Sequence, residues 1–388
     1  MTTEVVIVGA GMAGCSIAAH VSRFASVAVL EAGRQVAMGG AAQNAGLIRR
    51  LDPEPCDRAL AQRTYDFLSS RRSDLSQVTG AVLGMVRDPL TLNDACAHLR
   101  ARGIAVEQAH PSDFPLLDGS PLSGAWYLPD ERVTSGPQLA QALLEEAELN
   151  GASIHTRRTV SKLLIENGRC TGVQTPTGDV HADLTIIAAG AWSGILAAQA
   201  GLNRPLIPLR RMAAITPFLK DEDWRHPWCW LDDVGLYAKP DKDGWLVSPC
   251  DEQPEPQALG RPSTGSPSEQ QWTLLKDKIS TFLPRLTNRP MTRSWTGLRT
   301  FSPDRKPMLG ADGECDDLYW AAGLGGSGLS TCIGVGEALA SWLQGKATPW
   351  LNPSGVAPDR PQLHRWPIYP SGDPRFAKLI SSDLVFTL

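Results

Sequence analysis

The sequence predicts a mixed α/β fold, with α/β segments at both ends of the chain and a β-rich middle. Continuous apolar runs followed by small residues occur near residues 9, 190 and 323, and such runs are typical of parallel strands buried on both faces. Residues 204–300 instead alternate apolar and polar side chains, which indicates a mainly antiparallel sheet. The expected fold therefore combines a parallel sheet with an antiparallel one.

The composition is that of an ordinary globular protein. Of 388 residues, 42% are hydrophobic and 20% are charged, and at ~150 residues per domain this length favours two or three domains. The 37 basic and 41 acidic residues give a net charge of −4, which argues against a nucleic-acid-binding protein. The eight cysteines show no C-x-x-C spacing, so no metal site is expected.

The sequence shows no membrane or export signal. No apolar run reaches the ~18 residues that a membrane-spanning helix needs. The first residues lack the basic and apolar regions of a secretory signal, so we expect a cytoplasmic protein.

The start of the chain carries the clearest motif. Residues 4–8 form an apolar strand, residues 9–14 have the pattern G-x-G-x-x-G, and residues 15–23 have helical apolar spacing. A second apolar run at 27–30 ends in Glu31. This glycine pattern between a strand and a helix, with an acidic residue about twenty positions on, predicts a dinucleotide-binding βαβ unit.

Each residue of this motif has a physical role. Gly9 permits the tight turn, Gly11 lets the backbone approach a pyrophosphate, and Gly14 lets the helix and the strand pack closely. The helix N-terminus offers free N–H groups to the phosphates. Glu31 accepts hydrogen bonds from ribose hydroxyls and repels a 2′-phosphate, so we expect FAD or NAD rather than NADP.

The remaining elements follow in order along the chain. Small residues at 39–46 are expected to lie close to a ligand. The apolar spacing predicts helices over 57–72, 92–102, 137–149 and 331–344, and strands over 153–156, 160–166, 170–175, 183–188 and 318–322. Gly136-Pro137 marks the start of the third of these helices, since proline is favoured in a first helical turn. The proline-rich chain from Pro349 onward is expected to wrap the surface.

Four segments together resemble the D-amino-acid oxidase superfamily of FAD-dependent oxidoreductases. They lie at 8–14 (with Glu31), 43–46, 187–193 and 321–330, in the order of that family. Three further segments are similar to the branch that contains D-arginine dehydrogenase and D-amino-acid dehydrogenase: PLRR at 208–211, LYAKP at 236–240 and WTGLR at 295–299.

The resemblance implies a two-domain fold. A Rossmann-like FAD-binding domain would comprise residues 1–80, 131–202 and 300–348, and a mainly antiparallel substrate-binding domain would comprise residues 81–130 and 203–299. Residues 349–388 would form a C-terminal extension. The FAD is expected to be non-covalent, because residues 300–304 contain no cysteine. The glycine-rich segment at 321–330 disfavours an NAD-dependent dehydrogenase.

The resemblance also implies the residues that hold FAD. Those expected to do so are Gly9, Gly11, Met12, Ala13, Gly14, Glu31, Ala32, Gln43, Asn44, Ala45, Gly46, Val160, Ala189, Gly190, Trp192, Gly325, Gly326, Ser327, Gly328, Leu329 and Ser330. Backbone N–H groups within the last five are expected near the O2 edge of the flavin.

Four residues are implied at the reacting centre. Arg299 matches an arginine that clamps the substrate carboxylate, and a guanidinium can do so bidentately. Arg211 matches a second such arginine, with Arg210 as the alternative, since neighbours on a strand point to opposite faces. Tyr237 matches a tyrosine whose hydroxyl reaches the carboxylate, and the carbonyl of Gly326 is expected to face the substrate amine.

The expected reaction is oxidation of an amino acid. A hydride leaves Cα for flavin N5, and the imino acid then hydrolyses to a keto acid and ammonia. No general base is required if the amine arrives neutral. The electron acceptor would be O2 or a quinone, and the absence of a lysine from residues 244–248 favours a dehydrogenase.

Departures from the D-arginine branch predict the substrate side chain. Residues 81–85 contain no acidic residue, and Leu47 stands where that branch carries a histidine. A neutral or aromatic D-amino acid is therefore expected, lined by Leu47, Leu83, Met85 and Trp230. Arg49 or Arg50 would meet a second acidic group, bind FAD phosphate or face solvent.

Two other functions fit the same sequence. One is an oxidase of a secondary or N-methyl amine, such as a sarcosine-, glycine- or imino-acid-like substrate, in specialised metabolism. The other is a flavin-binding subunit without turnover, which loss of Arg299 or Tyr237 would favour; both residues are present.

Overall fold

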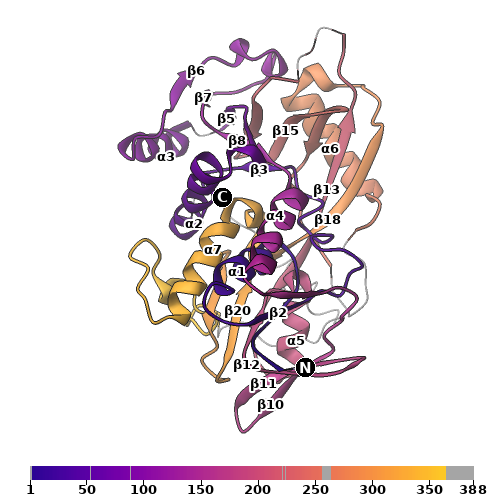
Figure 1. Ribbon diagram of the computed structural model, residues 1–388. Helices are drawn as coiled ribbons and strands as arrows, with labels where there is room; N and C mark the ends of the chain where they lie inside the picture. The colour runs from indigo at the N-terminus through magenta and orange to yellow at the C-terminus, as the bar shows by residue number, and fades with distance from the viewer. Residues whose placement is uncertain are drawn as a thin grey trace.

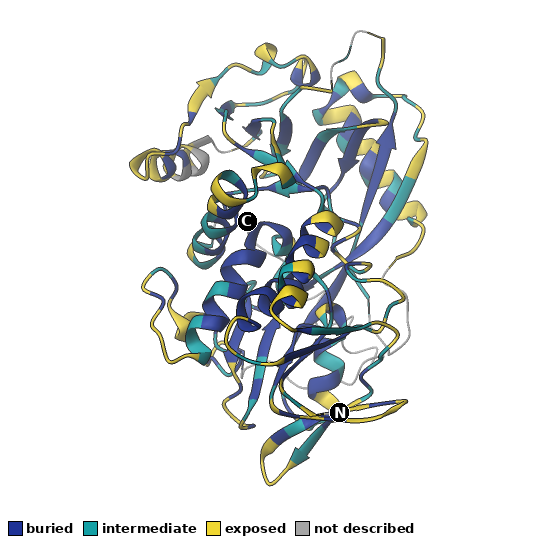
Figure 2. Cartoon of the chain, in the orientation of Figure 1, coloured by how far each residue is buried: buried dark blue, intermediate teal, exposed yellow. Residues whose placement is uncertain are grey.

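Two large sheets organise the computed structural model, which describes residues 2–52, 54–87, 89–220, 222, 224–255 and 264–363 (Figure 1). The first sheet occupies the lower half of the view and the second the upper half. Figure 2 shows that buried residues follow the strands of both sheets and the inner helices α1 (Met12–Val21) and α7 (Gly328–Leu343). The mixed α/β fold predicted from the sequence is confirmed.

The first sheet contains the predicted parallel strands. Its order is β10 (Lys162–Glu166), β11 (Arg169–Thr175), β12 (Gly178–Ile187), β1 (Thr2–Val8), β2 (Val27–Leu30) and β9 (Ser153–His155), with β20 (Leu318–Ala322) beside β12 and β19 (Met308–Ala311) beside β20. β1 runs parallel to both β12 and β2. Its residues 5–8 are buried, as expected for a central strand.

Helices cover one face of this sheet. α1 packs against α7 and α4 (Gly136–Leu149), and α7 also packs against α2 (Pro55–Asp66). Their apolar residues join those of β1 and β2 in one core. The short helix α5 (Ser193–Gln199) follows β12 and packs with a second core that contains Leu163, Val173 and Trp320.

The second sheet is antiparallel apart from the parallel pairing of β14 with β5. Its order is β21 (Leu324–Gly325), β18 (Arg293–Phe301), β13 (Ile207–Thr216), β16 (Gly244–Ser248), β15 (Leu236–Asp241), β14 (Trp228–Leu231), β5 (Ala81–Met85), β7 (Gly124–Leu128) and β6 (Glu107–Ala109), with β17 (Gln253–Pro254) beside β13. Helix α6 (Glu269–Phe282) packs on it through Leu275 and Ile279.

The two sheets meet at residues 318–325. β20 is a strand of the first sheet, and β21, only two residues later, extends the second sheet by pairing with β18. Helix α7 begins directly afterward. A small sheet of β3 (Leu47–Ile48), β8 (Arg132–Thr134) and β4 (Ser76–Val78) lies beside this junction. The chain is therefore arranged so that glycine-rich loops converge between the sheets.

Several element boundaries differ from the predictions. The helix predicted over 57–72 is α-helical only to Asp66 and continues as a π-helix over Phe67–Arg71. Helix α3 (Pro89–Ala101) begins before its predicted start at 92, and α7 begins at 328 rather than 331.

The C-terminal segment is described as far as residue 363. There Arg360 is buried and its side chain forms an ion pair with Asp304 at 2.6 Å, which fixes the chain against the loop after β18. The rest of the predicted extension, residues 364–388, lies outside the described residues.

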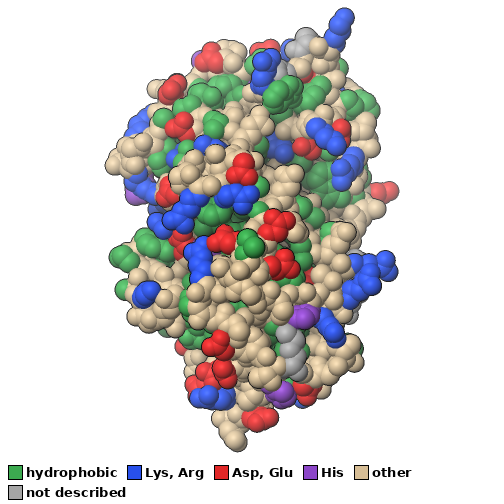
Figure 3. All heavy atoms as spheres, viewed as in Figure 1, with side chains coloured by type: hydrophobic (Ala, Val, Ile, Leu, Met, Phe, Trp, Pro, Cys, Tyr) green, Lys and Arg blue, Asp and Glu red, His purple; other side chains and the backbone are tan. Residues whose placement is uncertain are grey.

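The surface shows no single dominant charge on the face in Figure 3, where basic and acidic side chains lie interspersed. Among the described residues, no helix is long and apolar enough to cross a membrane.

Candidate active site

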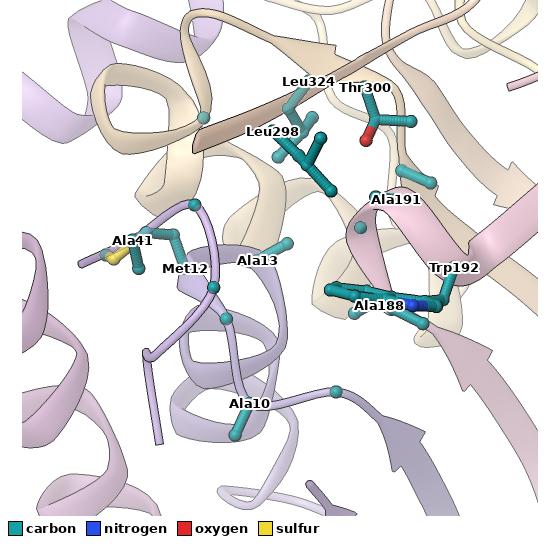
Figure 4. Close-up of a pocket in the computed structure, with 18 of the residues that line it drawn as sticks. Ala10, Met12, Ala13, Ala41, Ala188, Ala191, Trp192, Leu298, Thr300 and Leu324 are labelled. Carbon is teal, nitrogen blue, oxygen red and sulfur yellow. The ribbon is translucent and has the colours of Figure 1, made fainter. Parts of the chain in front are cut away.

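A cavity of about 480 Å³ lies at the carboxyl ends of the parallel strands. Loops after β1, β2, β12 and β20 line it, at residues 8–13, 30–33, 188–192 and 321–326. In Figure 4, Met12, Ala13 and Ala41 lie on one side of the cavity, Ala191 and Trp192 lie on the other, and Leu298, Thr300 and Leu324 lie above. Ligands of open α/β sheets bind at this edge.

The glycine loop forms a cradle of backbone at one wall. Gly9 has a φ of +102°, and a Cβ there would lie 2.6 Å from the carbonyl oxygen of Ala188. A Cβ on Gly14 would lie 1.9 Å from the carbonyl oxygen of Gly9, whereas one on Gly11 would meet nothing within 4 Å. No side chain caps the N-terminus of α1 and no acidic residue lies in its first turn. This geometry fits the pyrophosphate of a dinucleotide.

Glu31 joins the glycine loop to the next turn. Its carboxylate oxygens accept hydrogen bonds from the backbone N–H groups of Ala10 (2.9 Å) and Gly33 (2.6 Å), and the residue lines the cavity. Its contact with a ribose stays a prediction.

Most of the predicted FAD-binding residues line this cavity. They are Gly9, Gly11, Met12, Ala13, Glu31, Ala32, Asn44, Val160, Ala189, Gly190, Trp192, Gly325, Gly326, Gly328 and Leu329. Four others, Ala45, Gly46, Ser327 and Ser330, line a second cavity instead.

Two predicted FAD-binding residues line neither cavity. Gly14 packs against the glycine loop, and Gln43 is buried beside Gly297 and donates a hydrogen bond to the carbonyl of Met38. Residues that line the first cavity but were absent from the prediction include Arg158, Thr159, Leu298 and Thr300. They lie outside the glycine-rich motifs, although Leu298 belongs to the segment 295–299.

The second cavity, of about 790 Å³, adjoins the first beneath the antiparallel sheet. Arg299, Asn44 and residues 324–326 line both cavities. Arg211, Trp230 and Tyr237, from β13, β14 and β15, line only the second. The two cavities therefore share the place where a flavin ring and a substrate would meet.

Arg299 is a cation without an acidic partner at this shared boundary. Its guanidinium donates only to the carbonyl of Leu298, at 3.4 Å, and forms no ion pair among the described residues. Burial and the nearby charge of Arg211 lower the pKa of Arg299 below its usual range. A half-buried guanidinium with no counter-ion is unfavourable, and such a group is typical of a site that takes an anion.

Arg211, and not Arg210, faces the second cavity. Its guanidinium donates to Glu252 at 3.0 Å and to the carbonyl of Asp251 at 3.3 Å. Arg210 points to the opposite face, where it contacts Glu255 and Thr296. The alternation of side chains along β13 explains this difference.

Glu252 is shared by two arginines. It accepts hydrogen bonds from Arg211 (3.0 Å) and from Arg305 (2.9 and 2.5 Å). Burial alone would raise the pKa of Glu252, but the hydrogen bond from Arg305 and the two positive charges outweigh it and lower the pKa. The group is therefore an anion that two cations share.

Tyr237 and Trp230 form a stacked pair in the cavity wall. Their ring centres lie 5.2 Å apart and their planes differ by 10°. They are directly opposite each other in the pairing of β14 with β15. Burial raises the pKa of Tyr237, so its hydroxyl stays protonated and can donate a hydrogen bond.

Arg49 lies over the ring of Trp230. Its guanidinium carbon is 4.4 Å from the indole centre, and it forms an ion pair with Asp52 at 2.6 Å. Arg50 points elsewhere and forms a buried ion pair with Glu131 at 2.7 Å. Of the two arginines, only Arg49 lines the second cavity, and neither lines the first.

The expected side-chain pocket was wrong in part. Leu47 and Trp230 line the second cavity, whereas Leu83 and Met85 do not. Both of the latter are buried in a core with Cys96 and Leu99 of α3. In the sheet, β5 is separated from β15 by β14. Leu83 and Met85 of β5 therefore pack against α3 and do not line the cavity.

Several residues of the second cavity were not among the predicted site residues, and Cys250, Lys278 and Asp57 are examples. Cys250 adopts a φ of +50°, and Lys278 donates three hydrogen bonds to backbone carbonyls at 2.6–2.9 Å. Asp57 is buried in the first turn of α2, and one of its oxygens has no partner among the described residues. Burial and the charges of Asp52 and Glu54 raise the pKa of Asp57 well above its usual range.

Comparisons with known proteins agree with this geometry. The family model "FAD dependent oxidoreductase", DAO, matches residues 4–342. Glycine oxidase of Pseudomonas aeruginosa is 26% identical over 379 residues, covering 92% of this chain and 99% of that protein. The pyruvate dehydrogenase phosphatase regulatory subunit of Mus musculus is 27% identical over 379 residues, covering 88% of this chain. This chain spans only 41% of the mouse protein's length.

Solved structures share the fold. L-Proline dehydrogenase from P. horikoshii has a TM-score of 0.82 at 23% identity, covering 92% of this chain and 97% of that one. Iminodiacetate oxidase from Chelativorans sp. BNC1 has a TM-score of 0.75 at 21% identity, covering 92% and 99%.

The family match spans the glycine loop, the strands that surround both cavities and most of helix α7. The cradle at Gly9 and Gly11 fits the cofactor of that family, which is FAD. The chain belongs to the DAO family of FAD-dependent oxidoreductases.

Proposed function

We propose that the protein oxidises an amine that carries a carboxylate, either an amino acid or a secondary amino acid. One observation carries this proposal: Arg299 is half-buried and has no acidic partner among the described residues where the two cavities meet. A substrate carboxylate would supply the missing counter-ion. Its amine-bearing carbon would then lie at the boundary between the cavities.

The surrounding residues supply orientation. Arg299 would bind the carboxylate through its two parallel N–H groups, and the protonated hydroxyl of Tyr237 would donate a further hydrogen bond. Arg211 lies beside the same space, since its terminal nitrogen is 3.6 Å from where a Cβ on Gly326 would be. The carbonyl of Gly326 would accept a hydrogen bond from the amine.

FAD, when bound, accepts the hydride that leaves the carbon next to nitrogen. The substrate also loses a proton from nitrogen, so a C–N single bond becomes an imine. Water then adds to the imine, giving an oxo acid and ammonia from a primary amine. With a secondary amine, the same step releases an oxo acid or aldehyde and a smaller amine.

The two substrate classes are equally supported. The D-amino-acid alternative rests on the similarity of residues 208–211, 236–240 and 295–299 to the D-arginine branch. The secondary-amine alternative is supported by similarity to 4-methylaminobutanoate oxidase of Paenarthrobacter nicotinovorans, which is 26% identical and of which this chain spans 46%. A non-catalytic role is disfavoured because Arg299 and Tyr237 both face the cavity.

Anaerobic mixing of the FAD-loaded protein with D-, L- and N-methyl amino acids tests the proposal. Loss of the oxidised flavin's visible absorbance with one class would identify the substrate. Return of the colour on admission of air would show that O2 is the acceptor, and its absence would favour a quinone. Oxidised flavin that no amino acid reduces would contradict the proposed function.

A further inference from the structure

We propose that the substrate carries a second acidic group and that Arg49 binds it. This inference rests on the proposed function, because it places the first carboxylate at Arg299. It deepens that function by assigning a specificity residue in the same cavity.

Arg49 is held in place from three directions. Its backbone N–H lies 3.1 Å from the hydroxyl of Ser330, at the start of α7. Its guanidinium stacks on Trp230, with the carbon 4.4 Å from the ring centre. One terminal nitrogen pairs with Asp52 at 2.6 Å, and Asp52 also accepts a hydrogen bond from Ser327 at 3.2 Å. The guanidinium is thus fixed before a ligand arrives, which lowers the entropic cost of binding.

The rest of the Arg49 fork remains available. Its Nε and its second terminal nitrogen have no hydrogen-bond partner among the described residues. Stacking on an indole uses the flat face of a guanidinium and leaves its edges free for hydrogen bonds. Because Arg49 lines the second cavity, these donors are accessible to a bound ligand. They match the paired oxygens of a carboxylate.

The spacing suits a substrate with two acidic ends. Trp230 contacts both groups: its ring centre lies 5.2 Å from that of Tyr237 and 4.4 Å from the guanidinium carbon of Arg49. The guanidinium of Arg49 therefore lies less than about 10 Å from the ring of Tyr237, beside which the first carboxylate is proposed. A chain of a few bonds spans this distance, as in an acidic amino acid or an amine with two carboxymethyl arms.

Cys250 lies near several cations in the wall of the second cavity. Burial raises the pKa of its thiol, the charges of Arg211, Lys278 and Arg49 oppose this rise, and the charge of Asp251 adds to it. All three N–H groups of Lys278 are used by backbone carbonyls, so Lys278 contributes charge but no free donor. Arg49 combines charge with free donors.

Four of the acidic residues that line this cavity already have partners, whereas one oxygen of Asp57 has none among the described residues. Asp52 pairs with Arg49, and Asp232 accepts the indole N–H of Trp230 at 2.8 Å. Glu252 is shared by Arg211 and Arg305, and Asp233 accepts backbone N–H groups of residues 86 and 87. A cationic side chain would meet Arg49 directly. A neutral apolar one would leave its donors unpaired and desolvated, which is unfavourable.

Matched pairs of substrates test this inference. Iminodiacetate is compared with its monoamide, and each enantiomer of glutamate with the same enantiomer of glutamine, by anaerobic flavin reduction in the FAD-loaded protein. Each pair conserves size and differs in one charge. We expect the second acid to improve the rate constant divided by the dissociation constant by about tenfold or more.

Three variants separate the role of Arg49 from general charge effects. Arg49→Gln should reduce the preference for the acid to less than about twofold, and Arg49→Lys should retain much of it. Arg72→Gln, at an exposed ion pair with Asp74, should leave the preference unchanged. Binding of glutarate and its monoamide, followed by perturbation of the flavin spectrum, should show the same contrast without turnover.

The failures of the two proposals are distinguishable. If amino acids reduce the flavin but acid and amide react equally, or if Arg49→Gln keeps the preference, this inference is wrong and the proposed function stands. If no amino acid reduces the flavin, the proposed function fails and this inference fails with it.

Discussion

Arg299 and Arg211 both line the second cavity, and they lie close enough for the charge of Arg211 to contribute to lowering the pKa of Arg299. Of these two arginines, only Arg211 has a carboxylate partner among the described residues, namely Glu252 at 3.0 Å. Arg299 therefore has no ion-pair partner among the described residues, and Arg211 shares its partner Glu252 with Arg305. A fold gains nothing from such an arrangement unless a ligand completes it.

Replacement of Arg299 by glutamine should weaken substrate binding without weakening the fold. We expect the dissociation constant of a carboxylate substrate to rise about 10- to 100-fold, since hydrogen bonds to charged groups contribute about 1.5–3 kcal/mol. The midpoint of thermal unfolding should stay the same or rise, because a half-buried charge without an acidic partner is removed. Anaerobic titration and thermal melts of the FAD-loaded protein measure both.

Arg210→Gln is the matched control for that variant. Arg210 lies on the adjacent strand β13 but contacts Glu255 and Thr296 on the opposite face. The Arg210→Gln variant should keep the dissociation constant of the carboxylate substrate within about twofold of the wild-type value. Equal losses of affinity in both variants would contradict the role given to Arg299.

Replacement of Tyr237 by phenylalanine should affect binding modestly. The stacking on Trp230 is retained, so only the hydroxyl is lost. We expect the dissociation constant to rise about 3- to 10-fold, the range for one neutral hydrogen-bond donor. Tyr127→Phe, at a tilted ring contact with Phe114 away from both cavities, is the control. An unchanged affinity in Tyr237→Phe would show that the hydroxyl does not reach the carboxylate.

Local sequence patterns predicted the parts of the site that depend on backbone geometry. The glycine loop follows from a strand, a tight turn and a helix that are adjacent in sequence. The choice between Arg210 and Arg211 was narrowed to one inward side chain by the alternation along a strand, and the structure shows that it is Arg211. Both inferences need only the geometry of one element and its neighbours.

Local sequence patterns gave wrong or incomplete predictions where packing between distant elements determines the position of a side chain. Leu83 and Met85 were placed in the substrate pocket, but helix α3 covers them. Arg49 faces the cavity because Trp230, far away in sequence, supplies a stacking surface. Asp57 resembles an ordinary acidic residue in a first helical turn, and its burial depends on the chain around it. No periodicity within one segment encodes these contacts.

The buried ion pair of Arg204 with Asp312 should be important for stability. Both side chains are fully buried, the two groups are 2.7 Å apart, and Asp312 also accepts the indole N–H of Trp320. Removing one partner leaves an uncompensated charge, so Arg204→Gln should lower the free energy of unfolding by about 3–5 kcal/mol. Arg23→Gln, at an exposed ion pair with Glu146, should cost less than about 1 kcal/mol. Denaturant unfolding compares them, and equal effects would contradict the prediction.

Asp57 should make the protein less stable as the pH rises. Burial, together with the charges of Asp52 and Glu54, raises its pKa in the folded protein above the value in the unfolded chain, and Arg49 only partly opposes this. Between those two pKa values the folded state holds a proton that the unfolded state has released, so stability falls with increasing pH. Below the unfolded pKa both states are protonated and the penalty disappears.

Asp57→Asn should therefore raise the midpoint of thermal unfolding at pH 8 and should change it little at pH 4. Asp74→Asn is the control. The hydrogen bond from Arg72 lowers the pKa of Asp74, so ionisation of Asp74 does not make the protein less stable as the pH rises. That exposed variant should show no gain at pH 8. Thermal melts of the three proteins across this pH range measure the effect. A gain for Asp57→Asn that is as large at pH 4 as at pH 8 would mean that packing, and not ionisation, limits stability at this position.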